Sequence, residues 1–286
     1  MADYLLRDQA PLSEEQWERL DQTVKGVAER SLVGRRVIPL FGPFGPGVQA
    51  IPKDVFCGME QGKVDLLGEE EGGPVHCATR EYLPLPVIYK DFRIHWRDLE
   101  TSSQMGLALD VSPAAAAAAF CASAEDSMIF NGVEANGVAF QGLKGAEGRN
   151  RIAMSDWSQP GSSFQDVVNA TQALIQADFF GPFALVVSPR LYAGMNRLHG
   201  NSGRLEIEQV QRIATAGVYQ TPVLADDVAI VLSVGAENMD LAVGQDLVTA
   251  FLETLRMNHY FRVFEILALR IKRPGAICAI EKGGAG

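Results

Sequence analysis

The segment from Val48 to Tyr89 constrains the fold of this chain more than any other feature. Short apolar stretches alternate there with Gly and Pro, and the acidic run Glu69-Glu70-Glu71 lies between them. A segment of this length without helix signals rarely packs into a core of its own. The pattern therefore predicts a long two-stranded arm with a charged tip, which reaches onto a neighbouring subunit.

Two helices are strongly marked, one on each side of this arm. Ser13 and Gln16 form a capping box at the start of the first helix, and Gly34 ends it. The apolar residues that follow the cap recur at helical spacing: Trp17, Leu20, Val24, Val27 and Ala28. Ser112-Pro113 begins the second helix, Asn131-Gly132 ends it, and six consecutive alanines lie between them. An alanine-rich helix allows close approach by whatever crosses it.

The rest of the chain mixes both element types, so the predicted class is α+β. Further helices are expected from Ser163, from Ser188 and over Leu205 to Ala214. Strands are expected at Arg35–Leu40, Ala184–Val187, Val228–Val234, Met239–Val243, Leu247–Leu252 and Tyr260–Ile271.

The composition argues against several classes of function. The formal net charge is -10, whereas phosphate binding needs a basic face, so no nucleic-acid partner is expected. The longest apolar run, Val111 to Cys121, falls short of the roughly 20 residues of a membrane span. The N-terminus has neither the basic nor the apolar region of a secretory signal, and the four cysteines have no paired spacing. We therefore expect free thiols and a cytoplasmic protein.

The common catalytic and metal motifs are missing. Gly42 to Gly47 superficially resembles a phosphate-binding loop, but its two prolines lack N–H donors, so a rigid turn is expected. His76-Cys77 could begin a metal site, but the sequence has neither Cys-x-x-Cys nor His-x-x-x-His. No Glu-x-x-His pair of a ferritin-like di-iron site and no Gly-x-Ser-x-Gly of a hydrolase occurs. The neighbours Glu125 and Asp126 diverge on a helix, which favours a solvated or intersubunit face. The sequence thus predicts neither an enzyme nor a resident metal.

A series of short segments carries a family resemblance over nearly the whole chain. In chain order they are Ala10–Trp17, Leu32–Arg36, Gly42–Gly45, Leu83–Pro86, Trp96–Glu100, Glu125–Gly132, Gly181–Ser188 and Val243–Leu247. With these segments the chain resembles encapsulin shell proteins, and in particular members whose cargo is ferritin-like. The resemblance implies an icosahedral homo-oligomer that encloses a cargo enzyme for iron storage and protection against oxidative stress.

The implied fold is the Hong Kong phage-type major capsid fold. Its parts would be an N-terminal helix and arm over 1–47, an extended loop over 48–90, a peripheral domain over 91–131 and 226–286, and an apical domain over 132–225. The chain departs from the pattern by continuing from Pro274 to Gly286 beyond the last expected strand.

In this family a C-terminal peptide of the cargo docks on the inner wall of the shell, beside the first helix. The positions carried over for this docking are Val27, Leu32, Arg35, Val37, Leu241, Val243 and Asp246. Some of them would instead fill the core of the subunit. The segment His199, Gly200, Asn201, Ser202, Gly203 and Arg204 resembles a pore loop, whose small polar residues would leave an open channel for ions. Trp96 matches a position that binds a flavin in some members, and iron would be handled by the cargo.

Two alternatives stay open at this point. A phage or prophage major capsid protein has the same fold, but usually needs a scaffolding segment or a maturation protease. A hydrolase or bacteriocin-like protein is the third interpretation, against which the missing triad and metal spacings argue.

Overall fold

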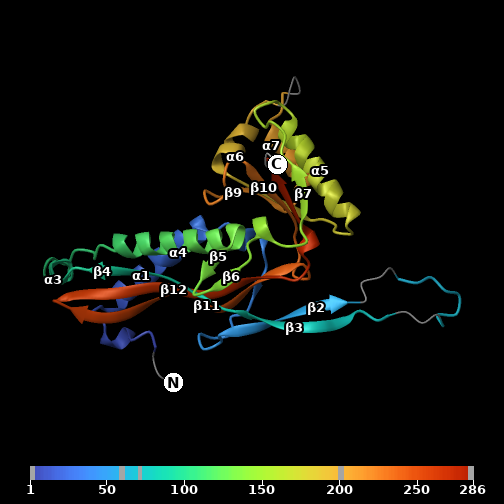
Figure 1. The fold of residues 1–286 in the computed structure, drawn as a ribbon. Coiled ribbons are helices and arrows are strands. Elements are labelled where there is room, and N and C mark those ends of the chain that lie inside the picture. Colours follow the sequence, from blue (N-terminus) through green and yellow to red (C-terminus); the bar gives the residue numbers. More distant parts are fainter. Residues whose placement is uncertain (1–3, 58–61, 70–72, 199–202, 283–286) are drawn as a thin grey trace.

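The computed structural model describes residues 4–57, 62–69, 73–198 and 203–282. They form an elongated lower body, a compact upper body and an arm that projects away from both (Figure 1). Helices and strands occur in both bodies, which confirms the predicted α+β class. Within the described ranges, no helix combines the length and the apolarity needed to cross a bilayer.

A four-stranded sheet forms the lower body. Its order is β1 (Leu40–Phe41), β11 (Met239–Leu255), β12 (Asn258–Ile271) and β4 (Val87–Ile94), with β1 parallel to β11 and the other pairs antiparallel. Helices α1 (Glu14–Ser31) and α4 (Ser112–Asn131) pack against each other and against this sheet. Large side chains from α1 and the sheet meet small ones from α4: Trp17, Leu20, Val24, Phe92, Phe251, Phe261, Ala114, Ala117, Ala118 and Cys121. The short alanine side chains let α4 lie close to both partners.

The start of the first predicted helix and the end of the second follow from local chemistry, whereas α1 ends at Ser31 and the expected stop, Gly34, lies in a further short helix. The Ser13 hydroxyl accepts from the Gln16 N–H at 3.2 Å, and the Ser13 N–H donates to the Gln16 side chain at 2.9 Å. Helix α4 ends at Asn131 because Gly132 has a φ of 79°, and a Cβ there would lie 2.6 Å from the Phe140 carbonyl oxygen. Only glycine therefore fits this stop.

A five-stranded sheet forms the upper body. Its order is β7 (Asn150–Ala153), β13 (Ile277–Glu281), β10 (Val228–Ser233), β8 (Phe183–Val187) and β9 (Gly217–Gln220). Helices α5 (Ser162–Gln176), α6 (Pro189–Met195) and α7 (Glu206–Ile213) pack around it. The hairpin of β5 (Val133–Ala135) and β6 (Val138–Phe140) and the turn η2 (Leu143–Gly145) connect α4 to this body. Strands β8, β10 and β13 are buried along their whole length, and they form the centre of its core.

Two C-terminal strands differ from the domain boundaries expected from the sequence. Residues 226–286 were expected in the peripheral domain, yet β10 and β13 pair with each other, with β8 and with β7 of the upper sheet. The chain beyond Ile271 forms the turn η3 (Pro274–Ala276) and then β13, an interior strand. Its short apolar run suits a strand buried on both faces, but such a run does not reveal which sheet it joins.

The arm consists of β2 (Ala50–Cys57) and β3 (His76–Pro84), which pair antiparallel and confirm the predicted two-stranded segment. At its base, Ile51 and Leu83 pack against Phe264 and Ile266 of β12. Beyond the base, the described side chains of β3 are exposed to solvent. In the described part of the arm, apolar side chains thus pack against the lower body at the base, whereas the rest of the arm makes little apolar contact within the subunit.

Arg270 fixes the base of the arm to the lower body. Its Nη1 donates to the Pro52 carbonyl oxygen at 3.0 Å, and its Nε and Nη2 donate to Asp240 at 2.9 and 2.7 Å. The same guanidinium lies 4.4 Å from the centre of the Phe41 ring. One side chain therefore joins β12, β11, β1 and β2.

Two local predictions were wrong, and one helix was missed. The first half of the expected strand at Arg35–Leu40 lies in the short helix α2 (Gly34–Val37), because the carboxylate of Asp126 binds the backbone N–H groups at its start. β11 is one strand with register shifts where two strands were expected. Helix α3 (Trp96–Met105), preceded by a His95 side chain that accepts from the Arg97 N–H, was not expected. Each outcome depends on contacts that a short sequence window does not contain.

Candidate functional site

A groove of about 580 Å³ lies between α1 and β11. Its floor is apolar and consists of Val24, Ala28, Leu32 and Leu247. The capping box fixes where α1 begins, and the helical spacing then turns Trp17 and Leu20 into the core. The later part of the same apolar stripe borders the groove.

Charged side chains of both signs surround this floor. They are Arg7, Lys25, Arg35 and Arg36 as cations, and Asp21, Glu29 and Asp246 as anions. Arg7 is held in place, since it donates to Asp21 at 2.7 and 2.9 Å and lies 4.5 Å from the Trp17 ring centre. An apolar floor with a charged rim suits a short peptide that inserts a few apolar side chains.

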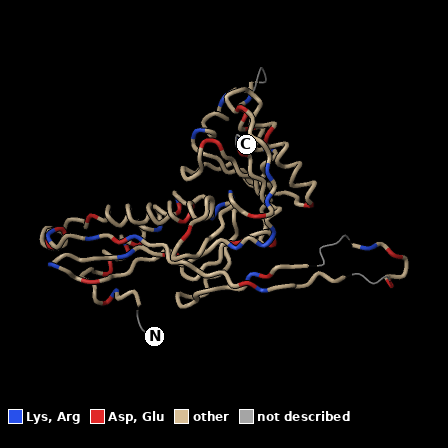
Figure 2. Tube along the Cα trace, in the orientation of Figure 1, with Lys and Arg blue, Asp and Glu red and all other residues tan. Residues whose placement is uncertain are grey.

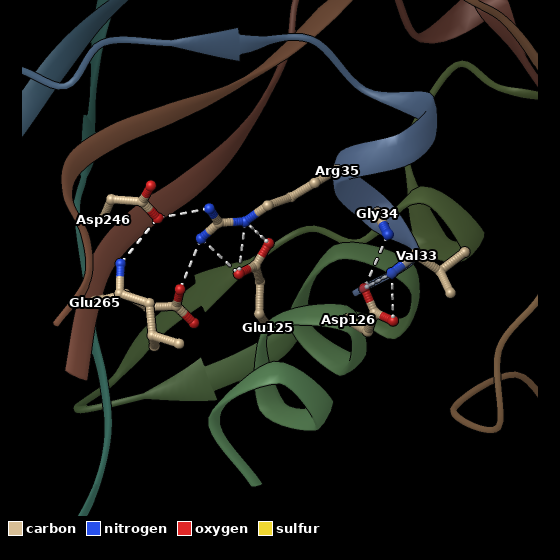
Figure 3. Close-up of polar contacts among 8 residues, drawn as sticks. Val33, Gly34, Arg35, Glu125, Asp126, Asp246 and Glu265 are labelled. Carbon is tan, nitrogen blue, oxygen red and sulfur yellow. Dashed lines mark hydrogen bonds and ion pairs between the residues drawn. The ribbon is translucent and has the colours of Figure 1, made fainter. Parts of the chain in front are cut away.

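Arg35 ties three elements together at one end of the groove (Figure 3). Its Nε donates to Glu125 of α4 at 2.9 Å, and its Nη2 donates to Glu265 of β12 at 2.7 Å. Its Nη1 donates to Asp246 of β11 at 2.6 Å. The carboxylates of Glu125 and Glu265 are buried, whereas the Asp246 side chain is 60% exposed. Arg35 therefore connects a buried acidic pair to one acidic residue on the groove surface.

Burial and charge set the protonation of this cluster. Burial opposes the charge of Arg35, but the hydrogen bond and charge of Glu125 and the charge of Glu265 raise its pKa above the usual value. Burial, followed by the charge of Glu125, raises the pKa of Glu265 well above its usual value. Glu265 Oε1 is also buried without a hydrogen-bond partner in the described structure. Burial acts the same way on Asp246, but the hydrogen bond and the charge of Arg35, with the hydrogen bond from the Leu247 N–H, together outweigh it, so the pKa of Asp246 is lowered.

Asp126 has a separate role beside this cluster. Its Oδ1 accepts from the N–H groups of Val33 and Gly34 at 3.1 and 2.9 Å. Burial raises the pKa of Asp126 to about 6, while these hydrogen bonds act in the opposite direction. Glu125 and Asp126 are both buried, so the expected solvated or intersubunit face was wrong. Each diverging side chain has a partner in the segment after α1.

The structure brings together three of the seven docking residues carried over from the family. Leu32, Arg35 and Asp246 line the groove. Val27 is half-buried and packs against the core of the lower body. The remaining three are buried in hydrophobic clusters and do not line the groove: Val37, Leu241 and Val243. Helical and strand spacing identifies apolar faces, but it does not separate the edge of a groove from the core beneath it.

Sequence reasoning missed most of the groove and the partners of Arg35. Val24 and Ala28 were assigned to the core stripe, although they also form the floor. Glu265 lies in an apolar strand, 230 positions from Arg35. The signal that could have found it is an acidic residue inside an otherwise apolar run, because a buried carboxylate requires a partner.

The other two predicted sites stand apart from this groove. His199 to Ser202 of the predicted pore loop lie outside the described residues, while Gly203 and Arg204 lead into α7. Leu198 and Leu205 form a β-bridge at the base of that loop. Trp96 begins α3, with the His95 ring stacked at 6.1 Å and the Arg97 guanidinium 5.5 Å from its ring centre. A flavin ring stacked on Trp96 would compete with these two side chains.

Charge is distributed without a single dominant sign over the described part of the chain. Figure 2 shows Lys and Arg interspersed with Asp and Glu along the lower body, the upper body and the arm. In the same described residues, no group of three or more His, Cys, Asp or Glu side chains could hold a metal ion.

Comparison with known proteins gives matches over the full chain. A family profile described as "Encapsulating protein for peroxidase" matches residues 2–268. The type 1 encapsulin shell protein EncA of Myxococcus xanthus is 48% identical over 285 residues, which are 100% of this chain and 99% of that protein. A diheme-cytochrome–encapsulin shell fusion protein of Kuenenia stuttgartiensis is 41% identical over 94% of this chain and 74% of the fusion protein.

Solved structures show the same fold at low sequence identity. The virus-like particle from Pyrococcus furiosus has a TM-score of 0.75 at 24% identity, covering 93% of this chain and 100% of that one. The capsid of Myoviridae phage XM1 has a TM-score of 0.62 at 11% identity, covering 86% of this chain and 90% of that one. The predicted Hong Kong phage-type capsid fold is thus confirmed. Because the family profile spans residues 2–268 and a shell protein is 48% identical over the whole chain, this chain belongs to the encapsulin shell proteins.

Proposed function

We propose that this chain is the building block of a closed icosahedral shell in the cytoplasm, with the arm of each subunit packed on a neighbour. The arm carries this proposal. Val55, Phe56 and Tyr82 are exposed along β2 and β3 in the single chain, and such side chains gain stability when a second subunit covers them. The free cysteines support a reducing compartment.

A cargo protein would dock from inside through a C-terminal peptide in the groove beside α1. The apolar floor formed by Val24, Ala28 and Leu32 supports this role, because it can accept apolar anchors without moving the backbone. Lys25 and Asp246 on the rim would orient the peptide through hydrogen bonds. In this proposal the shell encloses and binds the cargo, and the cargo protein carries out the reaction.

The cargo that we propose is ferritin-like, with iron storage and protection against oxidative stress as the result. Two observations support it: the resemblance to members with such cargo, and a ferritin-like–encapsulin shell fusion protein of Pyrococcus furiosus that is 27% identical over 77% of this chain and 58% of the fusion protein. The diheme-cytochrome fusion relative favours a haem protein as the second candidate. Iron would enter through pores and be handled by the cargo, without a resident cofactor in the shell.

Two experiments test these proposals. Negative-stain microscopy of the purified full-length protein should show closed, regular particles, and discrete monomers would contradict shell assembly. Co-expression with a ferritin-like protein that carries its C-terminal peptide should give particles containing both proteins. The same cargo without that peptide is the control, and equal loading of the two would contradict docking through the peptide.

A further inference from the structure

The N-terminal segment, residues 4–10, forms part of the wall of the groove beside α1. Its backbone lies against the edge of β11, where the Leu5 carbonyl oxygen accepts from the Phe251 N–H at 2.9 Å. The neighbouring side chains of Leu5 and Leu6 pack into hydrophobic clusters on opposite faces of the four-stranded sheet. The segment is therefore anchored on both sides of β11, and this places Arg7 in the wall of the groove.

Arg7 joins the N-terminal segment, α1 and β11 at this end of the groove. Its Nη1 and Nη2 donate to the Asp21 carboxylate of α1 at 2.7 and 2.9 Å. Its Nε and Nη2 also donate to the Thr249 carbonyl oxygen of β11 at 3.1 and 3.0 Å. A bidentate pair of this kind fixes the orientation of the guanidinium as well as its position. Arg7 is thus a fixed wall between the helix and the strand.

An aromatic ring lies behind this wall. The Arg7 guanidinium lies 4.5 Å from the centre of the Trp17 ring, whose other neighbour Phe261 has its ring centre at 5.7 Å. Trp17 is 9% exposed, and in the described structure it does not line the groove. It precedes Asp21 by one turn of α1 and belongs to the same apolar stripe as Val24 of the floor. Removal of the Arg7 side chain would therefore lengthen the apolar floor by about one turn of the helix.

The distance between the two ends of the groove determines how much peptide the floor can hold. The lining residues of α1 and its C-cap run from Asp21 to Leu32, over which the helix rises about 16 Å. An extended peptide advances about 3.3 Å per residue, so about five of its residues fit along the floor. Arg35 lies at one end of this stretch, and Arg7 lies at the other.

We propose that Arg7 sets the length of the cargo peptide that the groove accepts. It closes one end, and it covers the ring of Trp17 that would otherwise extend the floor. This inference rests on the docking of a cargo peptide proposed above. The guanidinium is already bound to Asp21 and Thr249, so Arg7 limits the peptide by the space that it fills. Arg7 is therefore a positioning residue that makes the groove selective for peptide length.

Competitive loading tests this selectivity inside assembled particles. Two fluorescent proteins of different colour are co-expressed with the full-length shell protein. One carries the shortest C-terminal peptide of the ferritin-like cargo that supports full loading, and the other carries the same peptide with two leucines added at one end. A second pair has the leucines at the other end. The colour ratio of the purified particles measures the preference for the longer peptide.

The two shells should differ at one end of the peptide. In wild-type particles, leucines at the end beside Arg7 should leave the ratio near that of equal loading, because the groove is closed there. In Arg7→Ala, the same leucines should favour the longer peptide about fivefold, because they gain apolar contact with Trp17. The end at which this gain occurs also gives the direction in which the peptide lies.

Two controls separate this effect from a general change of the shell. Two serines in place of the leucines should give no gain, because they add length without apolar surface. Arg19→Ala should behave as the wild type, since Arg19 is an exposed cation of α1 that does not line the groove in the described structure. Particle size shows whether each variant assembles.

Three results would contradict the proposal, and they differ in what they exclude. Equal preferences of Arg7→Ala and wild type at both ends would show that Arg7 does not limit the peptide. A wild-type shell that already favours the leucines at both ends would show that the groove is open, and this measurement holds even if Arg7→Ala does not assemble. If neither tagged protein is loaded more than an untagged one, the docking proposal itself is wrong, and this inference is wrong with it.

Discussion

At the scale of single residues, Arg35 carries the one positive charge that forms ion pairs with the buried Glu125 and Glu265 within the described part of the chain. Removing one partner of a buried ion pair leaves the other charges uncompensated. We expect Arg35→Ala to lower the free energy of unfolding by about 3–5 kcal/mol. Arg36→Ala is the matched control, since the Arg36 side chain donates to carbonyl oxygens of Glu29 and Arg30 on the exposed surface. Equal denaturant midpoints for the two variants would contradict this role.

This result matters for cargo docking as well. The sequence suggested that Arg35 contacts the cargo. The Arg35→Ala variant alone does not test this hypothesis, because the N–H donors of Arg35 already bind Glu125, Glu265 and Asp246 within the subunit. Asp246→Asn is the sharper variant, since it leaves the buried pair with its cation. We expect this variant to assemble normally and to carry less cargo when the two proteins are co-expressed. Full loading would remove Asp246 from the docking site.

Glu265 should give the protein a pH-dependent stability. Its pKa is raised in the folded state from a usual value of 4.5, so above that pH the unfolded chain loses a proton that the folded chain keeps. Stability then falls as pH rises through this window, by up to about 1.4 kcal/mol per pH unit. Glu265→Gln has no such proton, so its stability relative to wild type should increase as the pH rises above 4.5, the usual pKa of a glutamate.

Denaturant unfolding at several pH values measures this difference. Asp246→Asn is the comparison variant, because the pKa of Asp246 is lowered and its own contribution to stability changes only below the usual value of 3.8. Its offset from wild type should change much less over the same range, since the charge of Asp246 is only the smallest of the named contributions to the raised pKa of Glu265. A constant offset for Glu265→Gln would show that Glu265 is ionised in the folded protein.

At the scale of elements, the sequence predicted the helices and strands whose ends depend on neighbouring residues in the chain. Helices α1 and α4 follow from a capping box, an apolar stripe and a glycine that alone fits the stop. Helix α2 and strand β13 were missed because each depends on a distant partner, Asp126 in one case and a neighbouring strand of the upper sheet in the other. The groove was half found for the same reason, since Glu265 and Arg35 meet only in the folded chain.

The arm allows a test at this scale, because its base can be kept while its length is removed. Lys53 and Glu81 are register partners and form an ion pair at 3.5 Å, so Asn-Gly in place of residues 54–80 would close a tight hairpin between them. The contact of Arg270 with Pro52 is retained. We expect this variant to be folded but to form no closed particles. Regular shells would show that the arm is not needed for assembly.

At the scale of the whole molecule, shell formation and iron chemistry should separate. The described residues contain no group of three or more His, Cys, Asp or Glu side chains that could hold a metal ion, and the carboxylates of Glu125, Asp246 and Glu265 are paired with the Arg35 guanidinium. We therefore expect empty shells given Fe(II) in air to consume oxygen at the buffer rate, whereas shells with ferritin-like cargo consume it faster. The Cys57→Ser variant of the empty shell is the control for the arm, because the Cys57 sulfur lies 3.1 Å from His76 Nε2 and these two side chains could both bind an iron ion. Saturable Fe(II) oxidation by empty shells of both kinds would place a ferroxidase site in the shell itself. Oxidation that Cys57→Ser removes would instead place the reaction on the arm.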